Sequence, residues 1–141
     1  MSYLLDTDVT SEWAKPRPDQ RVVQWLGETY EHELYLSVVT WAELRRGIER
    51  LARGKRRDRL ADWLENELTH RFGARLLPIN AAIADGWGVI MAKREAEGRS
   101  IHSMDAFIAA TAEVHGLTLV TRNVSDFRET VRSILNPWNL D

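Results

Sequence analysis

Short apolar runs alternate with longer helical patterns along this chain, and the alternation restricts the fold more than any other feature. Four runs are brief and rich in branched or aromatic residues, as strands buried on both faces are. They cover residues 3–5, 34–39, 75–79 and 117–121. Strands that alternate with helices in this rhythm predict an α/β layer fold with a mainly parallel sheet.

Three segments between or after these runs carry apolar residues at helical spacing. The first covers residues 39–54 and is expected to end at Gly54, and the second covers residues 56–73. The third, "SMDAFIAATAEVHG", has Ser103 as its expected N-terminal cap and Gly116 as its expected end. Residues 15–20 contain two prolines and are predicted to form a loop.

Composition limits the function classes. The 141 residues, 44% of them hydrophobic, suit a single domain over residues 1–141. A net charge of −2 excludes a strongly basic nucleic-acid coat, so any nucleic-acid contact must be local. The absence of cysteine excludes disulfides, thiolate zinc sites and a cysteine nucleophile. No secretion signal or membrane-spanning stretch is evident, so we expect a soluble cytoplasmic protein.

Four acidic residues occupy places where a parallel sheet would gather them. Asp6 follows the first apolar run, and Asp126 lies beyond the last. Glu43 and Asp105 fall in the first turns of two predicted helices. Ligands of open parallel sheets bind beyond the carboxyl ends of the strands, where the strand order reverses. We therefore expect these four carboxylates at one edge of the sheet.

Such a cluster has an electrostatic consequence. Each ionised carboxylate raises the pKa of its neighbours unless a cation offsets the charge. Oxygen ligands without thiolates favour Mg²⁺ or Mn²⁺ over zinc. The sequence therefore predicts a divalent-cation site.

Each acid taken alone has an ordinary structural explanation. Asp6 could form a side-chain turn after a strand, and Asp126 could cap a short helix before Phe127. Glu43 could pair with Arg46 or rest in the field of its helix N-terminus, as Asp105 could. The inference therefore depends on the joint placement of the four residues.

Four segments together resemble one family. "YLLDTDVTSEW", "LSVVTWAELRRGIERL", "MDAFIAATAEVHGLTLVTRNVSDF" and the terminal "NPW" closely resemble the PIN-domain ribonucleases of bacterial toxin–antitoxin pairs, the VapC toxins. The resemblance runs through nearly the whole chain in order. It implies a compact three-layer α/β/α PIN-like fold, an Mg²⁺- or Mn²⁺-dependent endoribonuclease acting on RNA, a small cognate antitoxin and a homodimer.

The resemblance also assigns residues. The family's acidic site falls on Asp6, Glu43, Asp105 and Asp126, and Thr121 and Asn123 would position substrate or order the ligands. Asp6 and Asp105 would hold the metal most directly.

Asp8 departs from the family pattern, which usually has Asn at this place. A carboxylate cannot donate the hydrogen bonds of an amide and adds negative charge beside the site. We expect Asp8 to cap the short helix that follows it.

Two other functions compete. "LLDTDVT" also fits the opening motif of haloacid-dehalogenase-type phosphatases, with Asp6 as covalent nucleophile and Asp8 as general acid. That activity also needs a positioned lysine, and none of Lys15, Lys55 and Lys93 follows a convincing strand. The third possibility is a non-catalytic nucleic-acid-binding module.

The remaining features allow more than one interpretation. The basic run at residues 45–59 could bind RNA phosphates or an acidic antitoxin segment, or form a solvated, salt-bridged surface. The histidines fall mostly at helix ends or loops, where capping or solvated roles are expected: His32, His70, His102 and His115. The tryptophans are expected to be core or interface anchors: Trp13, Trp25, Trp41, Trp63, Trp87 and Trp138.

Overall fold

A single parallel sheet organises the computed structural model, which describes residues 1–140. The strand order is β3-β2-β1-β4-β5, and every pairing is parallel. The strands are β1 (Tyr3–Leu5), β2 (Leu34–Ser37), β3 (Leu76–Leu77), β4 (Thr118–Val120) and β5 (Ile134–Leu135). The chain builds outward from β1 in one direction and then continues with β4 on its other side, so the order reverses between β1 and β4.

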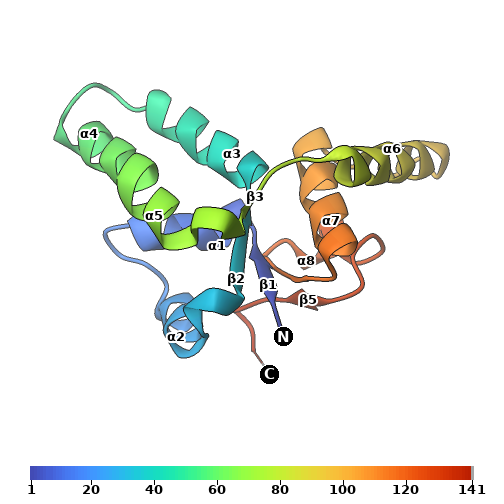
Figure 1. Cartoon of the computed structure of the whole chain (residues 1–141), viewed down its shortest axis with the longest axis horizontal. Coiled ribbons are helices and arrows are strands. Elements are labelled where there is room, and N and C mark those ends of the chain that lie inside the picture. Colours follow the sequence, from blue (N-terminus) through green and yellow to red (C-terminus); the bar gives the residue numbers. More distant parts are fainter. Residues whose placement is uncertain (141) are drawn as a thin grey trace.

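Helices cover both faces of this sheet (Figure 1). One group, α1 to α5, lies on one side, and α6, α7 and α8 lie on the other. The bounds are α1 (Thr7–Thr10), α2 (Gln20–Glu28), α3 (Val38–Glu49), α4 (Lys55–Asp62), α5 (Thr69–Phe72), α6 (Ala81–Ala96), α7 (Ser103–His115) and α8 (Val124–Phe127). Shorter turns are the 3₁₀ segments Ser11–Ala14, Glu31–Glu33 and Gly73–Arg75 and the π-helix Trp63–Leu68.

Two apolar cores separate the three layers. Leu5 and Val120 belong to one core with residues of α2, α3 and α5. Leu4 and Leu119 belong to the other, with residues of α7 and α8. Successive strand residues point to opposite faces, so both faces of the central strands are buried. The three-layer α/β/α fold with a parallel sheet is therefore confirmed.

Three of the four predicted strands are shorter than expected, and the run at 117–121 is reduced to β4 at Thr118–Val120. The run at 34–39 leaves the sheet after Ser37, because the Ser37 hydroxyl accepts a hydrogen bond from the Val39 N–H (3.0 Å) and caps α3. The run at 75–79 pairs only at Leu76–Leu77, and Pro78, which has no N–H, follows directly.

The helices also differ from the prediction in places. Helix α3 ends at Glu49, and Gly54 precedes α4 instead of ending α3. The segment at 56–73 is helical but passes through the π-helix before Gly73 ends it with a positive φ of 50°. Helices α2 and α6 and strand β5 had no counterpart in the sequence prediction.

Candidate active site at the β1/β4 switch point

Asp6 lies where β1 ends, at the reversal of strand order. Its backbone N–H donates to the Val120 carbonyl of β4 (2.9 Å), and its side chain is 5% exposed. One carboxylate oxygen accepts from the Thr7 N–H (2.8 Å), and the other accepts from the Thr121 hydroxyl (2.8 Å). Asp6 therefore caps α1 and joins β1 to the segment after β4.

Glu43 reaches the same edge from α3. The Thr7 hydroxyl donates to the Glu43 carboxylate (2.7 Å) across 36 positions of sequence. Thr7 thus contacts Asp6 through its backbone and Glu43 through its side chain. Sequence reasoning missed this role, although Thr7 stands between the two acids of the opening motif.

Asp8 does not cap α1, contrary to the prediction, because Asp6 is the cap and Asp8 lies inside the first turn. One Asp8 oxygen accepts from the Arg122 N–H (3.0 Å), while the other is buried and has no hydrogen-bond partner. Burial raises the Asp8 pKa, against the effect of the hydrogen bond from the Arg122 backbone. Asp8 therefore adds a buried acceptor oxygen to this region.

Asp105 lies in the first turn of α7, as predicted, but the cap is not Ser103. His102 is the cap residue, and its Nδ1 accepts from the Met104 N–H (3.3 Å). The pKa of Asp105 is raised by burial first, then by the charges of Glu43, Asp126 and Asp8, and His102 opposes these effects. Gly116 ends α7 in the left-handed conformation, as expected.

Asp126 lies inside the short helix α8 and does not cap it. The residue at the cap position is Asn123, whose carbonyl accepts from the Asp126 N–H (3.2 Å). The Asn123 N–H in turn donates to the Thr121 hydroxyl (3.0 Å). Thr121, which is fully buried, thus links Asp6 to the segment that carries Asp126.

The charges of these carboxylates act on one another. Burial and the charges of Asp8 and Asp105 raise the Asp6 pKa to about 7, although hydrogen bonds from Thr121 and Thr7 lower it. Since Asp105 in turn responds to Glu43 and Asp126, the four predicted acids and Asp8 belong to one electrostatic cluster.

The cluster is open. Within residues 1–140, no three His, Asp or Glu side chains are arranged to hold a metal ion together. Proteins usually bind Mg²⁺ through one or two carboxylates, with waters and substrate phosphates completing an octahedron. The donor set fits that mode, since its oxygens are hard, mutually repelling and, at Asp8, buried without a partner.

The basic run at 45–59 divides into two classes of side chain. Arg45 pairs with Glu49 and Glu65, and Arg57 also pairs with Glu49. Over residues 1–140, the other cations of the run form no ion pair: Arg46, Arg50, Arg53, Lys55, Arg56 and Arg59. In the described part of the chain, some cations of this surface are therefore neutralised by salt bridges, and the others have no ion-pair partner.

The tryptophans and lysines are explained by packing, ion pairing and their positions in helices. Trp25 and Trp138 are core residues, whereas Trp87 stacks on Phe107 with ring centroids 5.1 Å apart. Lys15 forms an ion pair with Glu12, and Lys93 lies on α6.

Comparison with known proteins decides the family. The PIN domain family model matches residues 3–132. The chain belongs to the PIN-domain family. This membership favours the nuclease alternative over the haloacid-dehalogenase one.

Curated relatives of this PIN domain carry toxin and ribonuclease names. Toxin FitB of Neisseria gonorrhoeae is 38% identical over 136 residues, which cover 96% of this chain and 98% of FitB. VapC ribonuclease Y4jK of Sinorhizobium fredii is 38% identical over 135 residues, which cover 96% of each protein. The resemblance to VapC toxins is thereby confirmed.

Solved structures agree with the fold of this PIN domain. The crystal structure of FitAcB from Neisseria gonorrhoeae contains a chain with a TM-score of 0.91 at 38% identity, covering 98% of this chain and 99% of that one. VapBC-1 from nontypeable Haemophilus influenzae gives a TM-score of 0.80 at 25% identity, covering 99% and 100%.

Among residues 1–140, no helix combines the length and the apolar character needed to span a bilayer.

Proposed function

We propose that this PIN domain is the toxin of a toxin–antitoxin pair and acts as a divalent-metal-dependent endoribonuclease. The observation that supports this most strongly is the gathering of Asp6, Glu43 and Asp8 at the β1/β4 switch point by hydrogen bonds from Thr7, Thr121 and Arg122. The charges of Glu43, Asp126 and Asp8 also raise the pKa of Asp105, after burial. The toxin and ribonuclease names of the relatives point the same way.

In this proposal, Asp6 and Asp105 hold Mg²⁺ or Mn²⁺ most directly, and Glu43 and Asp126 complete the shell or order its waters. When bound, the ion lowers the pKa of water and offsets the charge that grows on the RNA phosphate during in-line attack. Thr121 and Thr7 orient the Asp6 and Glu43 carboxylates through their hydroxyl donors. Asn123 would position the RNA substrate, or it would fix the turn that carries Asp126.

The test is RNA cleavage by the purified protein with Mg²⁺, with Mn²⁺ and with excess chelator. We expect cleavage with either ion, and loss in chelator. Asp105→Asn should reduce the rate by on the order of a hundredfold or more. Asp85→Asn, which removes an exposed carboxylate from α6, is the matched control and should keep the wild-type rate. Equal cleavage in chelator would contradict the proposal.

A cognate antitoxin would restrain the enzyme, and the groove beside Glu43 is the surface we assign to it. This groove, about 350 Å³ in volume, lies among α1, α3 and α4 and has a mostly apolar lining that includes Leu44, Leu51 and Trp63. Thr7 and Glu43 also line it, so a segment bound there would lie against the carboxylate site.

Gly47 offers a specific test of the antitoxin surface. It lines the groove, and a Cβ added there meets no atom within 4 Å, so Gly47→Trp introduces a bulky side chain into the groove from an unobstructed position. We expect this variant to cleave short RNA but to lose binding to the protein encoded by the neighbouring reading frame. Unchanged binding would place the antitoxin elsewhere. The predicted homodimer can be checked on the same samples by light scattering.

A further inference from the structure

Arg94, near the C-terminal end of α6, reaches across to the turn that follows α8. Its guanidinium donates to the Thr130 hydroxyl (2.9 Å) and to the Asp126 carbonyl (3.4 Å), which is 32 positions away in sequence. Its Nε also donates to the Arg99 carbonyl (2.6 Å). One side chain therefore connects the end of α6, the turn after it and the segment that carries Asp126.

The segment that carries Asp126 has little structure of its own. Helix α8 has four residues, too few to be stable without tertiary contacts. On its inner side, Phe127 is fully buried, and the Phe127 carbonyl accepts from the Thr130 N–H (2.9 Å). On its outer side, the Arg94 guanidinium donates to the Asp126 carbonyl near the end of the helix, where a positive charge is favourable.

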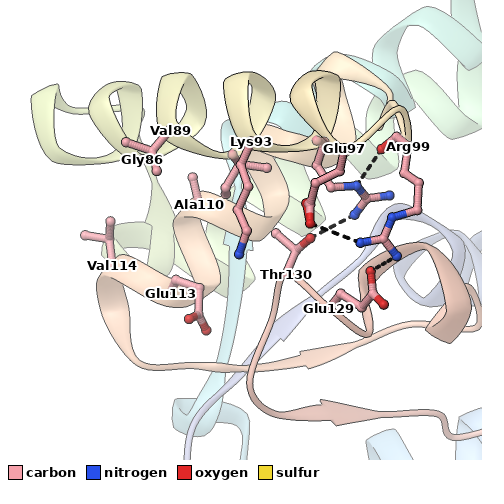
Figure 2. A pocket seen from close by; sticks show the side chains of 12 residues that line it. Gly86, Val89, Lys93, Glu97, Arg99, Ala110, Glu113, Val114, Glu129 and Thr130 are labelled. Carbon is pink, nitrogen blue, oxygen red and sulfur yellow. Dashed lines mark hydrogen bonds and ion pairs between the residues drawn. The ribbon is translucent and has the colours of Figure 1, made fainter.

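A second contact strengthens the same connection. Arg99, in the turn after α6, forms ion pairs with Glu97 and with Glu129. Figure 2 shows Thr130, Glu129 and Arg99 together at one end of the cavity between α6 and α7. The end of α6 and the turn after it thus contact Asp126, Glu129 and Thr130.

The position of this turn affects the carboxylate cluster. The Asn123 N–H at the start of α8 donates to the Thr121 hydroxyl (3.0 Å), which donates to the Asp6 carboxylate (2.8 Å), so a shift of α8 disturbs the contacts that join the Asp126 segment to the site. The charge of Asp126 also acts on Asp105. Arg94 holds the Asp126 backbone rather than its carboxylate, which leaves the carboxylate oxygens free to serve as ligands.

We propose that Arg94 is a positioning residue of the active site, which acts by fixing the turn that carries Asp126 beside the Asp6–Thr121–Asn123 hydrogen bonds. This inference rests on the proposed metal-dependent nuclease function. Arg94 itself touches neither RNA nor metal in this scheme. Thr130 is its partner, since its hydroxyl is the nearest side-chain acceptor of the guanidinium.

The experiment measures Mn²⁺ affinity by calorimetry, and kcat and KM for RNA cleavage, on the full chain. The variants are Arg94→Ala, Arg94→Lys and Thr130→Val, with Lys93→Ala as the matched control from the same helix. We expect Arg94→Ala to weaken Mn²⁺ binding and lower kcat by about tenfold, with KM changed by less than about twofold, as losses of residues that orient metal ligands do. Thr130→Val should show a smaller effect in the same direction, and Arg94→Lys should restore part of the loss.

A double-mutant cycle separates positioning from general destabilisation. In an Asp126→Asn background, adding Arg94→Ala should change Mn²⁺ affinity by less than about twofold, because the ligand it positions is already removed. A full tenfold effect in that background would overturn the inference, as would wild-type behaviour of both Arg94→Ala and Thr130→Val. Failure of the wild-type protein to bind Mn²⁺ or cut RNA would instead overturn the proposed function.

Discussion

Thr121 donates its hydroxyl proton to the Asp6 carboxylate across 2.8 Å, although the two residues are 115 positions apart in sequence. Both are buried, and the same hydroxyl accepts from the Asn123 N–H. This one side chain therefore orders two segments of the candidate active site.

Replacing Thr121 with Val should affect both stability and activity. The change conserves shape but leaves an Asp6 oxygen without its donor, at a cost of about 1–3 kcal/mol in the free energy of unfolding. We expect RNA cleavage to fall as well. Urea unfolding and initial rates measure the two effects.

Thr118→Val is the matched control for Thr121→Val. Thr118 is the first residue of β4, and Thr121 directly follows the same strand. The Thr118 hydroxyl shares a hydrogen bond with the Ser133 hydroxyl (2.8 Å), away from the carboxylates. This variant should lose stability without a specific loss of cleavage. A Thr121→Val protein with wild-type stability and wild-type rate would contradict the role assigned to this hydroxyl.

The stability of the metal-free protein should fall as pH rises from about 4 to about 7. The Asp6 pKa is about 7 in the folded state, against an ordinary value of 3.8, so between these values the folded state keeps a proton that the unfolded state releases. Stability falls with pH where the unfolded state binds fewer protons, here by on the order of 4 kcal/mol from Asp6.

Asp6→Asn isolates this pH dependence. In chelator, the variant should be more stable than the wild type at pH 8, because a buried charge is removed, and should differ little below pH 4. Denaturant unfolding across this pH range measures the difference. Parallel pH profiles for the two proteins would mean that Asp6 does not titrate as described.

Asp8→Asn should preserve nuclease activity. An amide can still accept from the Arg122 N–H, and it removes the negative charge that Asp8 places beside Asp6. We expect higher stability in chelator and metal-dependent cleavage within about tenfold of wild type, since Asp8 is an addition to the four acids. Abolished turnover, or trapping of an aspartyl-phosphate on Asp6, would support the phosphatase chemistry instead.

The free cations of the basic run should contribute to RNA affinity. Arg53 and Arg56 are exposed, whereas Arg57 on the same surface is paired with Glu49. Replacing Arg53 and Arg56 with Ala should weaken binding and reduce the dependence of log K on log salt by about 0.7 per lost phosphate contact. Arg57→Ala should change the slope less. Fluorescence anisotropy on a catalytically inactive Asp105→Asn background gives both values.

The sequence predicted those parts of the fold that depend on local pattern. The central strands and the end of α7 at Gly116 follow from apolar runs and one glycine. Strand β5 was missed because its apolar run is only Ile134–Leu135, between Ser133 and Asn136. The sequence also did not show which residue caps the N-terminus of α7. Ser103 has the stronger general preference for an N-cap position, but the folded geometry places His102 there.

The candidate site shows the same division. The acids were placed by the rule for strand ends, which needs only element order. The contacts that orient them, from Thr7 to Glu43 and from Arg122 to Asp8, join distant segments and have no local signature. The hydrogen bonds of Arg94 belong to this class too.

A crystal soaked in Mn²⁺ at pH 7.5, with anomalous data collected, tests the central claim most directly. We predict an anomalous peak within coordination distance of the Asp6 and Asp105 carboxylates, absent from an Asp105→Asn crystal treated identically. No peak in the wild-type crystal, or a peak away from these residues, would contradict the account.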